Sequence, residues 1–358
     1  MKNNLLRLPQ GTESLYLEET FRHRKILRHM EDMSEDWGYL PVQTPVFDFY
    51  DNYRQLLDSK LEEQTYKMID REGDLMMLRS DITLFLARQM GMILSEEELP
   101  LRVHYSDSIL RYQDHEDISS HEFFQAGCEL IGKPGREGDL EILFLLAELL
   151  RSLKLPESRI HVGSTELFKT IAGSLTPEGG TLLKKYLQTR EEKEIRKTLG
   201  RVYKKEDALE LSRLLLFIGS ADEFTAKAGD WEKLMEGALK PALDHLRSIS
   251  SGWKEIDGFD ELFNIDLSET GDQAYYAGIV FNAYTEGSGT AVASGGRYDG
   301  LLDHFGYTGG KPASSVGFSL FLRKLEKLSA IDIPGFPETE TDESISAAQK
   351  LAAVRKGK

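Results

Sequence analysis

The strongest constraint on the fold is a long helical stretch that separates two groups of strand-like segments. Residues 164–255 are rich in Glu, Lys and Leu and carry few strand signals. Strands that cluster away from long helices do not follow the alternating order of a wound parallel sheet. We therefore predict an α+β fold, a mostly antiparallel sheet flanked by helices and interrupted by a helical insertion. Strand patterns lie on both sides of that stretch, at 65–79 (a hairpin), 101–106, 122–131, 261–268, 275–283, 289–294 and from Ser315.

Helical periodicity and turn residues organise the rest of the chain. Apolar positions recur at helical spacing over 17–37, and a further helix is expected at about 82–91. Gly138-Asp139 is taken as the start signal of a helix from Asp139 to Leu153. Gly295–Gly300 is predicted to be a turn, and Ser315–Leu328 a strand that passes into a helix. We expect residues 1–328 to form one core domain with the insertion at about 164–255, and 329–358 to form a short C-terminal tail.

Composition argues against several classes of protein. The 44 basic and 60 acidic residues give a net charge of −16, which disfavours binding to phosphate backbones. No apolar run approaches the roughly 18–20 residues of a membrane span, and the N-terminus lacks a signal peptide, so a cytoplasmic protein is expected. The single cysteine, Cys128, excludes an internal disulfide framework and a multi-cysteine metal site.

One strand pattern carries polar residues suited to binding a ligand. Along residues 122–131, period-2 geometry places Gln125, Gly127 and Glu129 on one face, while the other face is apolar. Glu129 can accept a hydrogen bond from an imidazole or an ammonium group, and Gln125 can both donate and accept. Gly127 leaves room for a ligand, and Asp81 offers a carboxylate to an α-amino group. The alternative is an ordinary half-exposed strand with one polar face.

Four segments together resemble the class II aminoacyl-tRNA synthetase core, and specifically histidyl-tRNA synthetase. The first segment resembles the dimer-forming motif of that class. The resemblance covers about residues 8–328, except for most of the insertion. The segments are Gly38–Pro45, Leu78–Thr83, Leu110–Tyr112 with Phe123–Glu129, and Tyr275–Phe281 with Ser294–Gly300.

This resemblance implies a histidine pocket. Taken alone, a pair such as Tyr275-Tyr276 is more often made of core or interface aromatics. Residues 295–299 alone would be an ordinary hairpin turn with a flanking salt bridge. Because all four segments occur in the order of the family, we favour the binding interpretation. The positions that match the histidine ligands of the synthetase are Asp81, Thr83, Gln125, Glu129, Tyr275 and Tyr276.

The residues that would serve ATP depart from the synthetase pattern. Adenylate formation needs cations around the α-phosphate. Of these, Arg111 is kept and could make a residual phosphate contact. The position of the adenine-stacking arginine holds Lys324, which lacks a planar guanidinium. Gln113 replaces a glutamate, Asp114 a basic residue and His121 an arginine. Phe124 replaces a histidine, and Gly271 a catalytic arginine.

A paralogous family has this profile: the regulatory subunits that partner the short-form catalytic ATP phosphoribosyltransferase subunit in histidine biosynthesis. Asp81 follows the pattern of that family, whereas Ser80 departs from its usual proline. Membership would imply a non-catalytic subunit that binds L-histidine for feedback and forms homodimers within a hetero-octamer. It would further imply a protein without a cofactor or a metal ion that binds neither nucleic acid nor a membrane. It would also imply that the anticodon-binding domain is missing. Two alternatives remain: an active ligase that adenylates histidine or another amino acid, and a scaffold whose pocket is vestigial.

Overall fold

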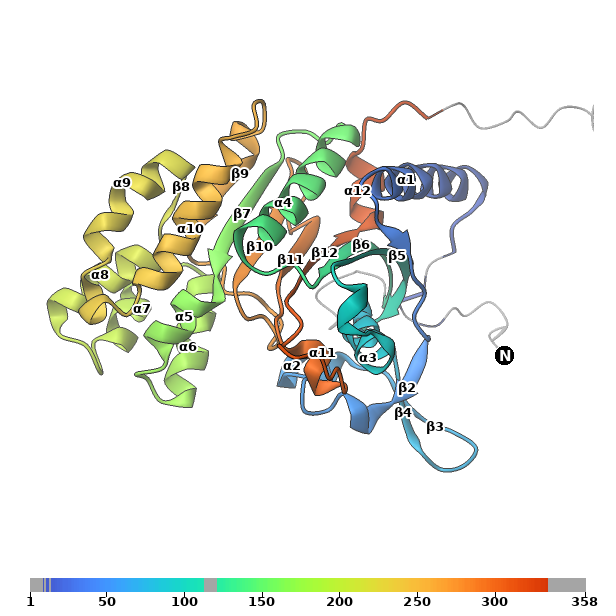
Figure 1. Cartoon of the computed structure of the whole chain (residues 1–358), viewed down its shortest axis with the longest axis horizontal. Coiled ribbons are helices and arrows are strands. Elements are labelled where there is room, and N and C mark those ends of the chain that lie inside the picture. Colours follow the sequence, from blue (N-terminus) through green and yellow to red (C-terminus); the bar gives the residue numbers. More distant parts are fainter. Residues whose placement is uncertain (1–8, 10, 13, 113–120, 334–358) are drawn as a thin grey trace, which may run out of the picture.

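A sheet of nine strands crosses the centre of the molecule (Figure 1). The computed structural model describes residues 9, 11, 12, 14–112 and 121–333. From one edge to the other the strands are β1 (Leu40–Pro41), β5 (Leu101–Leu110), β6 (Glu122–Ile131), β12 (Ser315–Phe321), β11 (Ala293–Arg297), β10 (Ile279–Tyr284), β7 (Arg159–Ser164), β9 (Phe263–Asp266) and β8 (Ile218–Gly219). β1 pairs with β5 and β7 with β9 in parallel, and the other neighbours are antiparallel. The predicted α+β class is confirmed.

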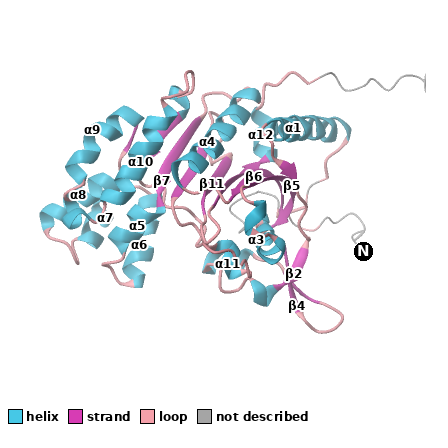
Figure 2. Cartoon of the chain, viewed as in Figure 1, coloured by secondary structure: helices cyan, strands magenta, loops and turns pink. Residues whose placement is uncertain are grey.

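Each face of the sheet is covered by its own hydrophobic cluster. On one face the apolar side chains of β6, at Ala126, Cys128 and Leu130, join those of α1 (Leu17–Asp36), α4 (Gly135–Ser152) and α12 (Leu322–Leu328). On the other face lie α3 (Ile82–Ile93) and the short α11 (Leu301–His304), which pack with Val103 and Tyr105 of β5. Figure 2 shows these helices on both sides of the strands. The period-2 pattern of β6 is confirmed, since its polar positions point away from the larger cluster.

Beyond β7, six helices form a helical lobe (residues 165–253; Figure 1). They are α5 (Thr165–Ala172), α6 (Pro177–Gln188), α7 (Glu192–Leu199), α8 (Lys205–Leu215), α9 (Ala221–Trp231) and α10 (Lys240–Trp253). α10 joins the lobe to the core, because Trp253 stacks on Phe144 of α4 with ring centroids 4.7 Å apart. The helical character expected for 164–255 is confirmed; the division into a core domain and an insertion stays a prediction.

A second, three-stranded sheet lies beside α3. Its strands are β2 (Phe47–Phe49), β4 (Leu75–Leu78) and β3 (Lys67–Ile69), in that order, and α2 (Ser59–Gln64) precedes β3. β3 and β4 are the hairpin predicted at 65–79. None of the described helices is both long and apolar enough to cross a bilayer.

Three local predictions were wrong. α4 begins at Gly135 rather than at Asp139, whose side chain is fully buried and paired with Arg297 instead of starting the helix. Residues 295–297 belong to β11, and the chain turns only at Gly300, which adopts φ +81°. Tyr275 and Tyr276 precede β10 and lie in a loop. In the first two cases a tertiary contact outweighed the local signal. The sequence patterns also missed β7, which lies between β10 and β9 in the sheet.

Candidate functional site

The floor of the candidate site is the polar face of β6, and Glu129 lies at its centre. Glu129 is 1% exposed and accepts hydrogen bonds from Thr83 Oγ1 and from Tyr298 Oη, both at 2.8 Å. Gly317 faces it across the β6–β12 pairing, and any Cβ at position 317 would overlap the carboxylate. Burial raises the pKa of Glu129 to about 8, so its carboxyl group is mostly protonated at neutral pH. A buried, proton-holding carboxyl can share that proton with a basic ligand nitrogen.

Gln125 provides the second polar group of β6. Its side chain is 3% exposed, and its Oε1 has no hydrogen-bond partner within the described ranges 14–112 and 121–333. An unpaired buried acceptor costs about 1–3 kcal/mol. Gln125 and Glu129 both line the same cavity. A ligand that donates an N–H group there would relieve this cost.

Gly127 has a different role from the one predicted. The space beside it is filled by the Phe318 carbonyl and the Tyr105 side chain, since a Cβ at 127 would stand 2.5 Å from Tyr105 Oη and closer still to the Phe318 oxygen. That hydroxyl is 2.6 Å from Ser319 Oγ, and Ser319 lines the cavity. The missing side chain therefore admits Tyr105, not a ligand directly.

The N-terminus of α3 forms one wall of the cavity. Asp81 caps the helix, because its Oδ1 accepts from the backbone N–H of Leu84 at 3.0 Å. Its Oδ2 lies 3.2 Å from Arg111 Nη2, and Arg111 also donates from Nε to the Ser80 carbonyl at 2.6 Å. Thr83 follows in the first turn. The carboxylate of Asp81 is thus held in place, and a ligand ammonium would share it with Arg111.

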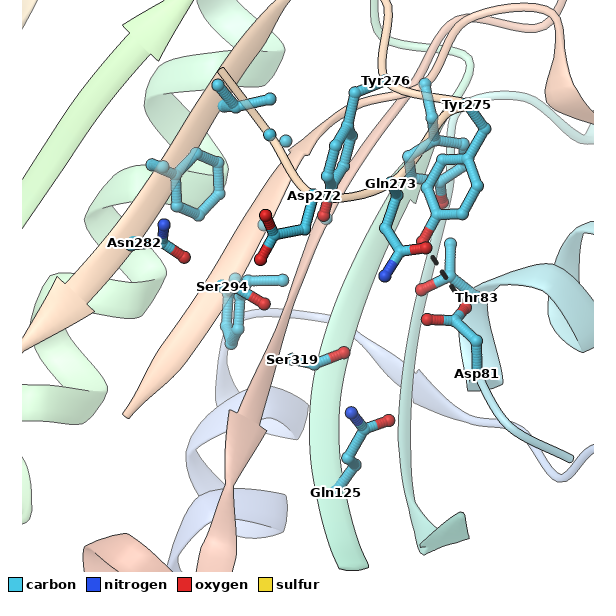
Figure 3. Close-up of a pocket in the computed structure, with 18 of the residues that line it drawn as sticks. Asp81, Thr83, Gln125, Asp272, Gln273, Tyr275, Tyr276, Asn282, Ser294 and Ser319 are labelled. Carbon is cyan, nitrogen blue, oxygen red and sulfur yellow. Dashed lines mark hydrogen bonds between the residues drawn. The ribbon is translucent and has the colours of Figure 1, made fainter. Parts of the chain in front are cut away.

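The loop between β9 and β10, residues 267–278, forms the opposite wall. We call it the ligand loop. Figure 3 shows Tyr275, Tyr276, Asp272 and Gln273 on this loop, across from Asp81 and Thr83 and above Gln125. Tyr275 Oη lies 3.5 Å from Asp81 Oδ1. The structure therefore brings together, around one cavity, all six residues predicted for the pocket.

The residues that replace synthetase positions serve other purposes here. Gly271 adopts φ +76°, and a Cβ there would stand 2.8 Å from the Tyr276 ring, so an arginine would be strained at this point. His121 Nδ1 lies 2.6 Å from Tyr66 Oη, and Phe124 packs edge-on against His23. Lys324 Nζ donates to the Ala291 carbonyl at 3.0 Å. Gln113 and Asp114 lie outside the described residues.

Sequence reasoning missed three side chains that organise the pocket. Tyr298 and Tyr105 are buried beside Glu129, and Ser319 bonds to Tyr105. Only Tyr298 had a signal, because it sits within the Ser294–Gly300 segment, which was predicted to end in a turn. For Tyr105 and Ser319 the sequence offers none, since their proximity depends on β5 and β12 flanking β6.

Comparison with known proteins gives consistent matches. The sequence model described as histidyl-tRNA synthetase matches residues 11–325. The "ATP phosphoribosyltransferase regulatory subunit" of Moorella thermoacetica is 33% identical over 330 residues, which cover 91% of this chain and 82% of that protein. The protein of the same name from Thermoanaerobacter sp. is 32% identical, covering 84% and 78% respectively.

Solved structures show the same fold. A regulatory subunit/histidyl-tRNA synthetase from Bacillus halodurans superposes with a TM-score of 0.81 at 24% identity, covering 99% of this chain and 91% of the other. Histidyl-tRNA synthetase from Nostoc sp. superposes with a TM-score of 0.78 at 18% identity, covering 98% and 84%.

Proposed function

The chain belongs to the ATP phosphoribosyltransferase regulatory subunit family, which shares the fold of histidyl-tRNA synthetase, and on this basis we propose that it is the non-catalytic, histidine-sensing partner of a short-form catalytic ATP phosphoribosyltransferase subunit. Its role is then in histidine biosynthesis, in the cytoplasm. The observation that carries the sensing function is the cavity itself, where the unpaired Gln125 acceptor and the buried Glu129 carboxyl lie on one strand.

The chemistry of the cavity suits histidine. In this proposal, Glu129 and Gln125 receive the imidazole, whose two ring nitrogens can donate and accept. Asp81 then receives the α-ammonium group beside Arg111, and in the same proposal Arg111 receives the α-carboxylate. Tyr275 and Tyr276 close the site from the side of the ligand loop. Burial strengthens each of these charge-assisted bonds, because they form away from water.

The alternative of an active ligase is disfavoured by the ATP side of the cavity. Gly271 stands where the synthetase has a catalytic arginine, and its φ of +76° does not accommodate that residue without strain. Losing one donor to the transition state typically costs ~10²–10³ in rate. We therefore assign the cavity to amino-acid recognition without activation.

We expect the purified chain to bind L-histidine in isothermal titration calorimetry and to show no histidine-dependent ATP–pyrophosphate exchange. A histidyl-tRNA synthetase assayed in parallel serves as the positive control. Exchange above background would favour the ligase alternative. Absence of binding, both alone and with the catalytic subunit, would favour the scaffold with a vestigial pocket.

We also propose homodimerisation through the surface near residues 38–50, within a hetero-octamer. Phe47 and Phe49 of β2 and Met68 of β3 lie on one face of the small sheet and are 52%, 45% and 40% exposed. Exposed apolar side chains gathered on one face are typical of an interface.

The dimer is tested by light scattering at micromolar concentration. The wild-type chain should scatter as a dimer and the Phe47→Asp variant as a monomer, because a charge on this face would be buried unpaired. Ile69→Asp is the matched control, since Ile69 is 72% exposed near the tip of the hairpin, on the opposite face. A monomeric wild-type chain would exclude this interface.

A further inference from the structure

The ligand loop, which supplies Tyr275 and Tyr276 to the pocket, is attached to the helical lobe. α5 makes two hydrogen bonds to its C-terminal end. Lys169 Nζ donates to the Tyr276 carbonyl at 2.8 Å, and the backbone N–H of Thr165 donates to the Gly278 carbonyl at 2.9 Å. Partial burial and the nearby charge of Lys184 lower the pKa of Lys169. The lobe thus holds the backbone of Tyr276, whose ring lies against Gly271 and Gly296 in the pocket wall.

The other end of the loop is held by the residues that follow α6. Arg190 Nη2 lies 2.6 Å from Asp266 Oδ2 and 3.0 Å from Ser268 Oγ. Asp266 is the last residue of β9 and is 2% exposed, so the guanidinium neutralises a buried charge. Between the two ends, Gln188 Nε2 approaches Asp272 Oδ1 at 3.4 Å. Three points along the loop are therefore in contact with α5, with α6 or with the residues that follow α6.

The region around Asp266 contains a group of possible metal ligands, but the carboxylate oxygens of this group already have protein partners. Ligand atoms of His161, Asp266 and Glu269 lie within 4.8 Å of one another. Glu269 accepts from Asn282 and Tyr284, both at 2.7 Å, and Asp266 accepts from His161 and from Arg190. The cation at this corner is the guanidinium of Arg190. Through Arg190, the cluster therefore connects the sheet to the helical lobe.

We infer that the helical lobe positions the ligand loop, and that Lys169 and Arg190 are the positioning residues through which the lobe sets the affinity of the pocket. This inference rests on the proposed function for the identity of the ligand, but its geometry does not. Coupling of this kind is reciprocal: a ligand that requires the ordered loop also tightens the contact between loop and lobe. Any partner that moved the lobe would change the affinity for histidine.

The first test uses the ligand-free protein and depends on no ligand. Hydrogen exchange should be faster at Tyr276 and Ala277 in Lys169→Met than in the wild-type chain, by about 3- to 30-fold, because a charge-assisted bond is lost. Lys169→Arg, which can still donate, should restore protection. Lys185→Met is the matched control, since Lys185 is an exposed lysine of α6.

The second test is the affinity for L-histidine. Lys169→Met and Arg190→Met should each weaken binding by about 3- to 30-fold, with little change in Lys185→Met. Wild-type exchange of the ligand loop in both variants would overturn the inference, and so would unchanged affinity in both. If the wild-type chain does not bind histidine while loop exchange still responds to Lys169→Met, the proposed function fails and the positioning role stands.

Discussion

Glu129→Ala is expected to leave a folded subunit that still supports its phosphoribosyltransferase partner but no longer makes the complex sensitive to histidine. In the proposed complex Glu129 shares its proton with the imidazole, so the pair is charge-assisted. Losing one partner of such a buried pair costs roughly 2–5 kcal/mol, or about 30-fold to several-thousand-fold in affinity. The substitution removes a ligand contact, not a subunit contact, and a ligand shifts an equilibrium only through differential binding. The measurement is a histidine titration of phosphoribosyltransferase rate in the reconstituted complex.

The surroundings of Glu129 make this experiment interpretable. In the ligand-free protein Glu129 is bonded to the neutral hydroxyls of Thr83 and Tyr298, so its removal leaves no uncompensated buried charge, and these hydroxyls lose an acceptor. Glu129→Gln is the matched control: it keeps the volume and an acceptor oxygen, so a smaller loss of affinity is expected. Inhibition curves unchanged from the wild type would place histidine sensing elsewhere.

Arg297→Met is expected to destabilise the fold more than any other single charge removal proposed above. Arg297 is 5% exposed and pairs with the fully buried Asp139 at 2.6 Å, and it also reaches Asp299 at 3.1 Å. Removing one partner of a buried pair costs about 3–5 kcal/mol, because the other charge is left uncompensated. His245 also bonds to Asp139, at 2.8 Å, which places the expected loss at the lower end of that range.

The check is urea unfolding followed by circular dichroism, with the free energy of unfolding compared between variants. Arg213→Met is the matched control, since Arg213 pairs with Glu210 at the surface and such pairs contribute about 0–1 kcal/mol. An Arg297→Met midpoint equal to that of the control would show that the buried pair adds no stability beyond an apolar replacement.

The sequence by itself determined the features that depend on near neighbours. The alternation of β6, the helices α1 and α3, and the hairpin of β3 and β4 follow from periods of 2 and 3.6 and from turn residues, all within a few residues. The six pocket positions were also identified in advance. They were found through the order of short motifs rather than through any single local pattern.

Only the tertiary structure decided what those side chains meet. Gly127 looked like room for a ligand until β5 placed Tyr105 beside it, and Arg297 looked like part of a turn until α4 brought Asp139 to it. The attachment of Lys169 to the ligand loop joins residues 107 positions apart. Such contacts depend on which strands and helices become neighbours in the folded chain. That arrangement is selected by burial of the whole apolar surface, and no local pattern in the chain encodes it.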